Sequence, residues 1–241
     1  MDHTGMTTTE WLSVIDAMEE VAPYYDRVNQ LITFGLADKW RAEVASRAAP
    51  DDVVLEMGSG PGTFARHLDA RRIYCLEPSA KLIRSSRSLL DEARIELIQG
   101  VGERVPLPDE SVDKVFCSFS FRDFRSREDG AKEMFRVLRK GGEAFIADVA
   151  KPPPGPMAKV LQLHVRHVVP VMARMAVDPW TRSHWKNNPY RKFVETYDAF
   201  GFTTIYERLL REEGFEGVTT EYLKMKGATV TRGKKPWKPT S

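Results

Sequence analysis

Short apolar runs alternate with helical patterns from Asp51 almost to the end of the chain. The runs "DVVLEM" and "RIYCLE" have the length and apolar content of buried parallel strands. Three further runs of the same character follow, "IELIQ", "VDKVFCSFS" and "EAFIADVA". Strands that alternate with helices predict right-handed βαβ units. Such units form a doubly wound parallel sheet, whose ligand crevice lies at the carboxyl ends of the strands.

The segment "SREDGAKEMFRVLRKGG" predicts a helix between the last two of these strands. Ser126 and Asp129 have the spacing of a capping box at its start. The apolar positions that recur at helical intervals are Ala131, Met134, Phe135 and Leu138. We expect Gly141 and Gly142 to end this helix.

The C-terminal part of the chain departs from the alternation. After the helical segment "FTTIYERLLREEGF" come the strand-like runs "GVTTEYLKM" and "ATVTR", with a turn at Lys226 and Gly227 between them. No helix fits into so short a connection, so these runs are expected to form an antiparallel hairpin at the sheet edge. The predicted fold class is therefore α/β, with a seven-stranded doubly wound sheet whose last strand is reversed.

Two segments lie outside the predicted sheet. Residues 10–48 have a helical pattern, and "KPPPGP" at 151–156 introduces an insertion that reaches to about residue 190. We therefore expect a helical cap over residues 1–50 and a main domain over residues 51–241 that carries a lid insertion at about 151–190. Apolar side chains recur at helical spacing along this insertion, at Met157, Val160, Leu161, Val165, Val168, Met172 and Met175. That stripe suits a long apolar ligand, packing on the sheet, or an interfacial helix at lipid headgroups.

The charge balance gives no reason to expect a nucleic-acid partner. The net charge is +2, and the basic cluster "RGKKPWK" is short and terminal, as is typical of a solvated tail. The segment "NNPY" at 187–190 is similar to a target-base motif, but it lies in the insertion rather than after the fourth strand.

Cysteine usage and hydropathy indicate the compartment. Cys75 and Cys117 each lie inside a predicted strand, without CxxC or metal-ligand spacing, which predicts buried free thiols and no metal site. The N-terminal "MDHTGMTTTEW" has no basic flank before an apolar core, and no run of about eighteen apolar residues occurs. We expect a cytoplasmic protein whose membrane contact, if any, is peripheral.

The stretch "VLEMGSGPGTF" places a glycine loop between the first strand and a helical pattern. Its glycines occupy alternate positions, Gly58, Gly60 and Gly62. This GxGxG spacing differs from the dinucleotide pattern GxGxxG, and no Lys-Ser or Lys-Thr follows as in a P-loop. Glu56 precedes the loop, and Glu77, followed by Pro78, ends the second strand, where a carboxylate can bind both ribose hydroxyls of a nucleoside. The arrangement predicts an S-adenosylmethionine site, because that cofactor has no phosphates and needs close backbone approach.

Longer segments carry a family resemblance from about Tyr24 to Lys235. They are "YYDRVNQLITFG", "VPLPDESVDKVFCSFSFRDF", "EMFRVLRKGGEAFIADVAKP" and "EEGFEGVTTEYLKMKGATVTRG". With these segments the chain resembles the methyltransferases of the seven-stranded fold, and more narrowly the UbiE-like C-methyltransferases of menaquinone and ubiquinone biosynthesis. The resemblance implies that the glycine loop and Glu77 bind the cofactor, with Ser118 nearby.

The resemblance also places the adenine next to Val101 and Gly102. The family commonly has Asn or Asp-Ala at these positions, so adenine would here be held by backbone groups or by Glu103. The family's loop also commonly ends in aspartate, where this chain has Thr63.

At the substrate end, "SFRDF" matches a family segment whose arginine is implicated in catalysis. Arg122 takes the place of that arginine, and Asp123 replaces the usual asparagine. Tyr25 corresponds to the tyrosine of the family's Tyr-Asp-x-x-Asn segment, which Asp26 and Asn29 complete. Methylating a quinol carbon requires an ionised ring hydroxyl and later loss of the ring proton. Arg122 could stabilise the phenolate, Asp123 or a water it orients could accept a proton, and Tyr25 could fix the ring hydroxyl.

Other roles stay open for these residues. Arg122 could instead form a salt bridge with Asp123 or Glu128, Asp123 could have a structural role at its loop, and Tyr25 could belong only to a lid. His164 and His167 are alternative bases.

The sequence thus predicts an S-adenosylmethionine-dependent methyltransferase that acts on a ring carbon of a lipophilic polyprenyl quinol. The alternatives are O- or N-methylation of another small molecule (a phenol, a lipid headgroup or an amine) and a non-catalytic cofactor-binding protein. Formation of a homodimer is left open.

Overall fold

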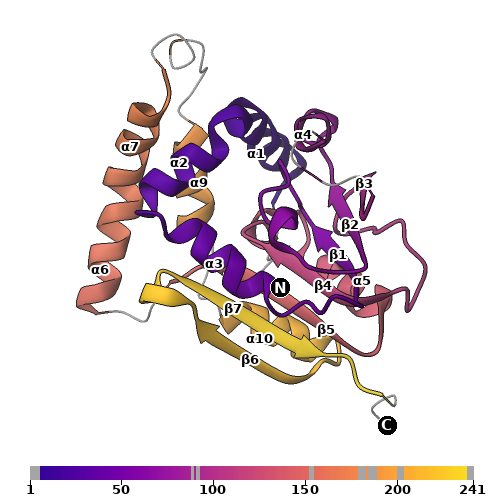
Figure 1. Ribbon diagram of the computed structural model, residues 1–241. Coiled ribbons are helices and arrows are strands. Elements are labelled where there is room, and N and C mark those ends of the chain that lie inside the picture. Colours follow the sequence, from indigo (N-terminus) through magenta and orange to yellow (C-terminus); the bar gives the residue numbers. More distant parts are fainter. Residues whose placement is uncertain are drawn as a thin grey trace.

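The computed structural model describes residues 6–87, 90, 93–151, 155–178, 183, 189–199 and 204–237. Within them a seven-stranded sheet has the strand order β3-β2-β1-β4-β5-β7-β6 (Figure 1). The strands are β1 (Val53–Met57), β2 (Arg72–Glu77), β3 (Ile95–Gln99), β4 (Val112–Ser118), β5 (Leu138–Val149), β6 (Glu216–Tyr222) and β7 (Ala228–Lys234). The first five pair in parallel, and β7 runs antiparallel to β5 and β6. The predicted α/β fold with a reversed last strand is confirmed.

The central strands are mostly apolar because helices cover both faces of the sheet. Every residue of β1 is buried. Leu55 packs in a core with side chains of α5 (Arg127–Val137) and α10 (Thr204–Glu212), whereas Val54 packs on the opposite face with α3 (Leu36–Ala45). Burying one such aliphatic side chain contributes about 1.5–3 kcal/mol. Cys75 and Cys117 are buried free thiols within strands, as predicted.

Helix α5 begins as the sequence predicts and ends earlier. The Ser126 hydroxyl accepts a hydrogen bond from the Asp129 backbone N–H at 3.1 Å. The prediction that Gly141 and Gly142 end the helix was wrong, because α5 stops at Val137 and Leu138 pairs with Val112 in the sheet. Leu138 is fully buried there, so burial in the sheet outweighs its place in a helical pattern.

The N-terminal helices lie beside the carboxyl ends of the strands. They are α1 (Thr8–Val21), η1 (Ala22–Tyr24), α2 (Tyr25–Ile32) and α3. Helix α1 begins with a capping box, in which Thr7 and Glu10 bind each other's backbone N–H groups. Helix α1 packs against α9 (Pro189–Ala199), and α2 packs against α7 (Val169–Ala176).

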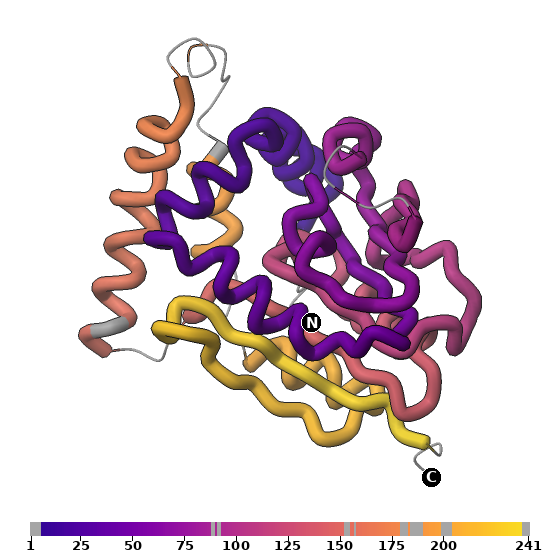
Figure 2. Tube along the Cα trace, viewed as in Figure 1, coloured from indigo at the N-terminus to yellow at the C-terminus, as the bar shows by residue number. Residues whose placement is uncertain are grey.

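The insertion forms a continuous rod of α6 (Pro156–Leu163), the π-helix η4 (His164–Val168) and α7 (Figure 2). Its predicted apolar stripe does not keep to one face: Val165 is 3% exposed, whereas Val160 and Met175 are 64% and 72% exposed. Val160 precedes the π-helix and Met175 follows it, so the exposed positions lie on both sides of it. The buried side of the rod packs on α2, and the proposed division into cap and lid stays a prediction.

Some predicted segments lie partly outside the described residues. These are residues 1–5 of the N-terminal segment, residues 152–154, 179–182 and 184–188 of the insertion (with Asn187 and Asn188 of "NNPY"), the start of "FTTIYERLLREEGF", and Lys238 of the basic cluster. Along the described residues, no helix is both long and apolar enough to cross a bilayer.

Candidate functional site

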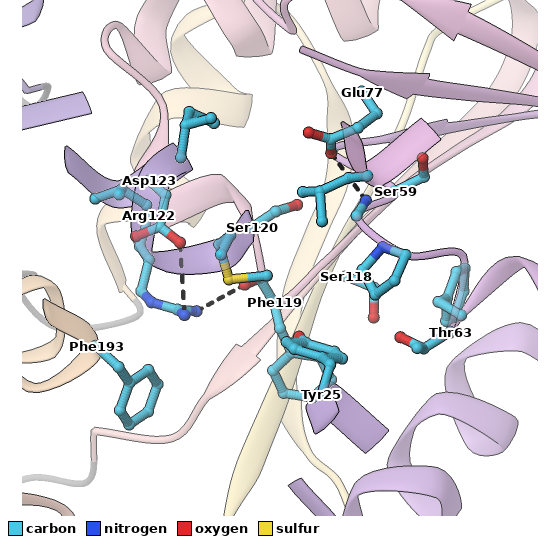
Figure 3. Close-up of a pocket in the computed structure, with 18 of the residues that line it drawn as sticks. Tyr25, Ser59, Thr63, Glu77, Ser118, Phe119, Ser120, Arg122, Asp123 and Phe193 are labelled. Carbon is cyan, nitrogen blue, oxygen red and sulfur yellow. Dashed lines mark hydrogen bonds and ion pairs between the residues drawn. The ribbon is translucent and has the colours of Figure 1, made fainter. Parts of the chain in front are cut away.

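A cavity lies at the carboxyl ends of β1, β2 and β4, beneath α1, α2 and α9 (Figure 3). Its walls include the predicted site residues Glu56, Gly58, Gly60, Glu77, Pro78, Val101, Gly102, Ser118, Arg122, Asp123 and Tyr25. Gly62 is not among the lining residues; it turns the chain away at φ +83°, close to Leu90. The fold therefore gathers into one space nearly all the residues that the sequence associated with cofactor and acceptor.

The glycine loop follows β1 and presents its backbone to the cavity. Gly58, Gly60 and Gly62 all have positive φ, a conformation that other residues rarely adopt. A Cβ on Gly58 would lie 2.6 Å from the Ser120 hydroxyl, so only glycine fits there. A Cβ on Gly60 would meet nothing within 4 Å, because this residue faces open space. A ligand can thus approach the loop backbone closely at Gly60.

Glu77 lies at the end of β2 and holds the glycine loop. Its carboxylate accepts hydrogen bonds from the backbone N–H groups of Gly60 and Ser79, both at 2.9 Å. The side chain is almost entirely buried, and this burial raises its pKa to about 7 against the opposing effect of the two bonds. Each carboxylate oxygen retains a lone pair for a further donor, such as a ribose hydroxyl.

Glu56 is a second buried carboxylate in the same wall. It is 1% exposed, and its nearest donor is the Cys75 thiol at 3.8 Å. Burial raises its pKa to about 8. A cavity with two buried carboxyl groups favours a ligand that carries positive charge and hydroxyl donors. S-adenosylmethionine has both, and the buried Ser118 hydroxyl, which lacks a hydrogen-bond partner among the described residues, adds a polar group at this wall.

At the predicted adenine end of the cavity, the Phe124 ring packs closely on Gly102. A Cβ on Gly102 would lie 2.1 Å from the Phe124 ring, so this position requires glycine. Glu103 is already engaged, because its carboxylate accepts the backbone N–H groups of Arg125 and Ser126 at 2.7 and 3.3 Å. This engagement favours the backbone of Val101 and Gly102 over Glu103 as the partner of adenine.

Arg122 lies in the short helix η3 (Phe121–Asp123) that follows β4. Its Nη1 donates to the Phe119 carbonyl at 2.9 Å and to Asp148 Oδ1 at 2.6 Å. The expected pairing with Asp123 is present but looser, at 3.6 Å (Figure 3). The Phe193 ring of α9 lies 5.2 Å from the guanidinium carbon. Asp148 was missed in the sequence analysis, although a lone acid within the apolar run "FIADVA" was a signal for it.

Asp123 is half-buried beside Arg122, with its side chain 19% exposed. Burial raises the pKa of its carboxyl group, against the lowering effect of the Arg122 charge. Its Oδ1 has no hydrogen-bond partner among the described residues. A carboxyl group with an unused, buried oxygen next to a cation can accept or relay a proton.

Tyr25, Asp26 and Asn29 of helix α2 make different contacts. The Tyr25 ring lines the cavity beneath the Arg41 guanidinium, 5.7 Å away. Asn29 donates to the Tyr25 carbonyl at 2.8 Å, and Asp26 accepts from Arg66 at 2.6 Å. Since Arg66 follows the glycine loop, the Asp26 pair ties α2 to the cofactor end of the cavity.

Two histidines and one arginine complete the comparison with the sequence. His164 binds the Ile32 carbonyl at 2.8 Å, His167 is exposed, and neither lines the cavity. Arg41 does line it at 3% exposure, although the sequence analysis did not single it out. Its signal was a basic residue inside the apolar helical pattern "KWRAEVA". Within the described residues, no cluster of His, Cys, Asp and Glu suits a metal ion.

Solved structures share this fold. An S-adenosylmethionine-dependent methyltransferase from Thermotoga maritima superposes with a TM-score of 0.65 at 20% identity, covering 92% of this chain and 99% of that one. An S-adenosylmethionine-dependent methyltransferase from Aquifex aeolicus gives a TM-score of 0.58 at 14% identity, covering 87% and 97%.

Relatives and a family model complete the comparison. The chain is 26% identical to the "ubiquinone/menaquinone biosynthesis C-methyltransferase UbiE" of Vibrio campbellii, over 95% of this chain and 90% of that protein. It is 32% identical to the "demethylmenaquinone methyltransferase" of Deinococcus radiodurans, over 66% of this chain and 69% of that protein. The model of the ubiE/COQ5 methyltransferase family matches residues 6–235. The chain therefore belongs to the ubiE/COQ5 methyltransferase family and is an S-adenosylmethionine-dependent methyltransferase.

Proposed function

We propose that this enzyme methylates a ring carbon of a polyprenyl quinol such as demethylmenaquinol. One observation carries the proposal: a buried guanidinium, that of Arg122, lines a cavity whose neighbouring walls are the aromatic rings of Tyr25, Phe119 and Phe193. Such walls suit a flat ring, and the fixed cation suits an oxygen that becomes negatively charged on it. The names of the curated relatives support the same substrate class.

Arg122 and its neighbours would make the acceptor carbon nucleophilic. S-adenosylmethionine, when bound, supplies an electrophilic methyl group on a sulfonium. The ring hydroxyl would lose its proton to water, and Arg122 would stabilise the resulting oxyanion, whose electron density reaches the neighbouring carbon. As the C–C bond forms, the methyl–sulfur bond would break and S-adenosylhomocysteine would leave with its electron pair. Asp123 or a water next to it would take the proton that this ring carbon then releases, and the oxyanion would regain a proton from water. Tyr25 donates to or accepts from a ring hydroxyl. One preorganised donor of this kind contributes about 2.7–4 kcal/mol to lowering the barrier.

Methyl transfer from labelled S-adenosylmethionine tests the proposal. The acceptors are demethylmenaquinol, a benzoquinol that lacks one ring methyl, a simple catechol, an aromatic amine and a lipid headgroup. We expect product only with the quinols, with the label on a ring carbon by NMR. Label on oxygen or nitrogen, or turnover with the catechol or amine alone, would replace the quinol with another small molecule.

The same proposal gives the outer face of the rod a role at a membrane surface. This face exposes Val160, Leu163, Val171 and Met175, and Phe34 beside it is 74% exposed. Residues 155–177 contain three basic side chains (Lys159, Arg166 and Arg174) and no Asp or Glu. An exposed apolar face without acidic residues fits the headgroup layer of an anionic bilayer, where a polyprenyl quinol resides.

Vesicle co-sedimentation tests this contact. We expect the protein to bind vesicles that contain anionic lipid, and Val160→Glu together with Met175→Glu to abolish that binding. Leu12→Glu is the matched control, because Leu12 is 51% exposed on α1, outside the rod. Equal loss with the control variant, or binding unaffected by the rod variant, would contradict the assignment while leaving the quinol assay intact.

A further inference from the structure

Three polar side chains from three separate elements, Arg122, Asp148 and Tyr206, form a buried chain of contacts. The Tyr206 hydroxyl of α10 donates to Asp148 Oδ2 of β5 at 2.8 Å, and Asp148 Oδ1 accepts from Arg122 Nη1 at 2.6 Å. Tyr206 and Asp148 are each 1% exposed. Neither lines the cavity, so neither can contact a ligand in it.

The Asp148 carboxylate is held on both oxygens. Its Oδ1 accepts from Arg122 and also from the backbone N–H of Val149 at 2.8 Å, while Oδ2 accepts from Tyr206. The Tyr206 ring is fixed in turn, because it packs edge-on against Phe121 with ring centroids 5.2 Å apart. A carboxylate bound from three directions cannot rotate, so the orientation of its partner guanidinium is determined.

The Nε and Nη2 groups of Arg122 form no hydrogen bond with a described residue. Its Nη1 is fully used by Asp148 and the Phe119 carbonyl. Its buried Nε has no partner among the described residues, and Nη2 lies 3.6 Å from Asp123, beyond hydrogen-bond distance. An unused donor at such a depth lowers stability. Nη2 is the group of Arg122 that can donate to a ligand in the cavity.

We propose that Tyr206 and Asp148 are positioning residues, which hold the Arg122 guanidinium in one orientation at the cavity wall, so that its Nη2 group is available to the acceptor oxygen. The arrangement follows the logic by which a buried carboxylate orients a catalytic imidazole. The inference rests on the proposed function for its acceptor, but the orientation of Arg122 can be measured without one.

Stability alone does not account for these three residues. A buried ion pair contributes little net stability, and apolar side chains of similar volume often replace one without loss. Tyr206 supplies the donor for Oδ2, the oxygen of Asp148 that neither Arg122 nor Val149 binds, and so fixes the carboxylate in the plane that Arg122 requires. Orienting a cation at a cavity is a task that apolar side chains cannot perform.

Tyr206→Phe is the first test, because it removes the hydroxyl and keeps the ring. We expect turnover with the quinol to fall about tenfold, the scale of one buried hydrogen bond, and the dissociation constant of the cofactor to stay the same. Tyr197→Phe is the matched control, since Tyr197 is 3% exposed and lies outside this chain of contacts.

A double variant separates positioning from a structural role. In an Arg122→Ala background, Tyr206→Phe should reduce the remaining turnover by less than about twofold, because its effect passes through Arg122. An equal loss in both backgrounds would overturn the proposal, because it would show that Tyr206 acts independently of Arg122.

Nitrogen NMR of the Arg122 guanidinium gives a second readout that needs no acceptor. A fixed guanidinium gives separate Nη signals, assigned by their loss in Arg122→Lys, and both Tyr206→Phe and Asp148→Asn should merge them. Separate signals retained in both variants overturn the positioning role. If the signals merge as expected but wild type methylates no quinol, the proposed function fails while the positioning of Arg122 stands.

Discussion

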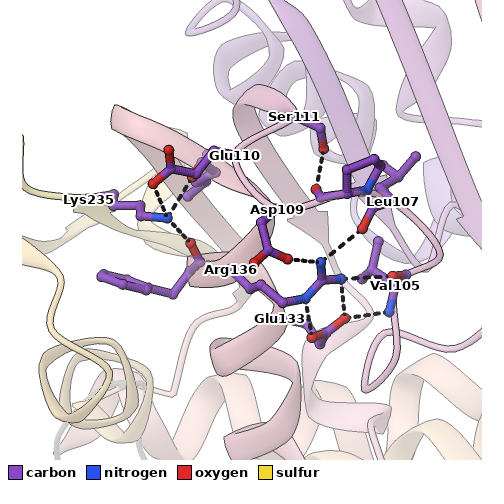
Figure 4. Close-up of polar contacts among 11 residues, drawn as sticks. Val105, Leu107, Asp109, Glu110, Ser111, Glu133, Arg136 and Lys235 are labelled. Atoms are coloured by element: carbon purple, nitrogen blue, oxygen red, sulfur yellow. Dashed lines mark hydrogen bonds and ion pairs between the residues drawn. The ribbon is translucent and has the colours of Figure 1, made fainter.

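Arg122 and Arg136 are both arginines within dense polar networks, and they use their donors in opposite ways. Arg136 of α5 donates to both oxygens of Glu133, to Asp109, and to the backbone carbonyls of Val105 and Leu107 (Figure 4). Every donor of its guanidinium is used by the protein. Arg122 leaves Nε without a partner and Nη2 without a hydrogen bond among the described residues.

The carboxylates beside the two arginines show the same contrast. Glu133 accepts from Arg136 and from the Val105 N–H, and although burial opposes them, these bonds lower its pKa. Asp123 beside Arg122 has its pKa raised by burial. A network in which every donor and acceptor is hydrogen-bonded stabilises the fold. A buried network with unpaired donors or acceptors lowers the stability of the fold, and those groups are available to a ligand. The contrast distinguishes a structural arginine from a functional one.

Replacing Arg122 gives the largest expected effect. Arg122→Ala should lower turnover by about 10²–10³, the scale for removing one preorganised donor, and leave cofactor affinity nearly unchanged. Arg122→Lys should recover only part of this loss, because a point charge cannot reproduce the planar donor fork. Steady-state kinetics and calorimetry on both variants check this. A fully active Arg122→Ala enzyme would end the functional reading of this residue.

Replacing Glu77 tests whether the free lone pairs of its carboxylate, at the cofactor end of the cavity, contribute to cofactor binding. Glu77→Ala should weaken S-adenosylmethionine binding by about 1.5–3 kcal/mol, the range for a charge-assisted hydrogen bond. Titration calorimetry measures the loss, and thermal unfolding shows whether the glycine loop keeps its fold when the Gly60 N–H loses its acceptor. Glu96→Ala is the control, since Glu96 is half exposed on the neighbouring strand β3. Equal affinity in wild type and variant would show that Glu77 does not bind the ribose of the cofactor.

Replacing Arg136 should affect stability and spare catalysis. Arg136→Ala leaves the carbonyls of Val105 and Leu107 without their donor, so we expect a loss of about 1–3 kcal/mol in the free energy of unfolding. Turnover per folded molecule should stay near wild type. Urea unfolding measures the first quantity and active-site titration normalises the second. Arg208→Ala is the control, because its exposed pair with Glu212 at 3.8 Å contributes little.

The sequence predicted the strands of the sheet better than the helices and turns that connect them. Buried parallel strands are continuous apolar runs, so β1 to β4 could be recognised one by one. The Leu138–Gly142 stretch misled because its periodicity is helical while its contacts, with Val112 and Lys235, lie far along the chain. Nor can periodicity anticipate a π-helix such as His164–Val168.

The candidate site was predictable to the same degree. Residues fixed by one strand end or one loop, such as Gly60 and Glu77, could be inferred because local sequence places them. The partner of Arg122 could not, since Asp148 is 26 residues away and Tyr206 is a further 58 residues beyond Asp148. Only the folded chain brings the three together.

The pH dependence of cofactor binding should separate the two kinds of carboxylate. Burial raises the pKa of Glu77 to about 7, above its ordinary value of 4.5, so the cofactor-free fold loses stability as pH rises from the lower value to the higher. The cationic cofactor binds the ionised form, so affinity should fall about tenfold between pH 8 and pH 6.

Calorimetry across that range checks the slope, and Glu77→Gln should flatten it. Glu133 behaves in the opposite sense: its pKa is lowered, so its contribution to stability is present above its unfolded value and is lost only as pH falls below it. Glu133→Gln should therefore leave the slope of cofactor binding between pH 6 and pH 8 as in wild type. A slope unchanged by Glu77→Gln would assign the ionisation to Glu56, whose pKa burial raises to about 8.

Replacing Asp123 gives the smallest expected effect. It tests how much the carboxylate beside Arg122 contributes to turnover. Asp123→Asn removes a charge but keeps the size and the hydrogen-bonding groups of the side chain. If Asp123 only orients Arg122 or a water, turnover should stay within about tenfold, a 1.4 kcal/mol effect, and the pH–rate profile should keep its ionisations. If Asp123 is the base, the variant loses activity together with one ionisation. We expect the first outcome, because Asp148 already holds Arg122 at 2.6 Å whereas Asp123 lies at 3.6 Å, and because the family usually has an amide here.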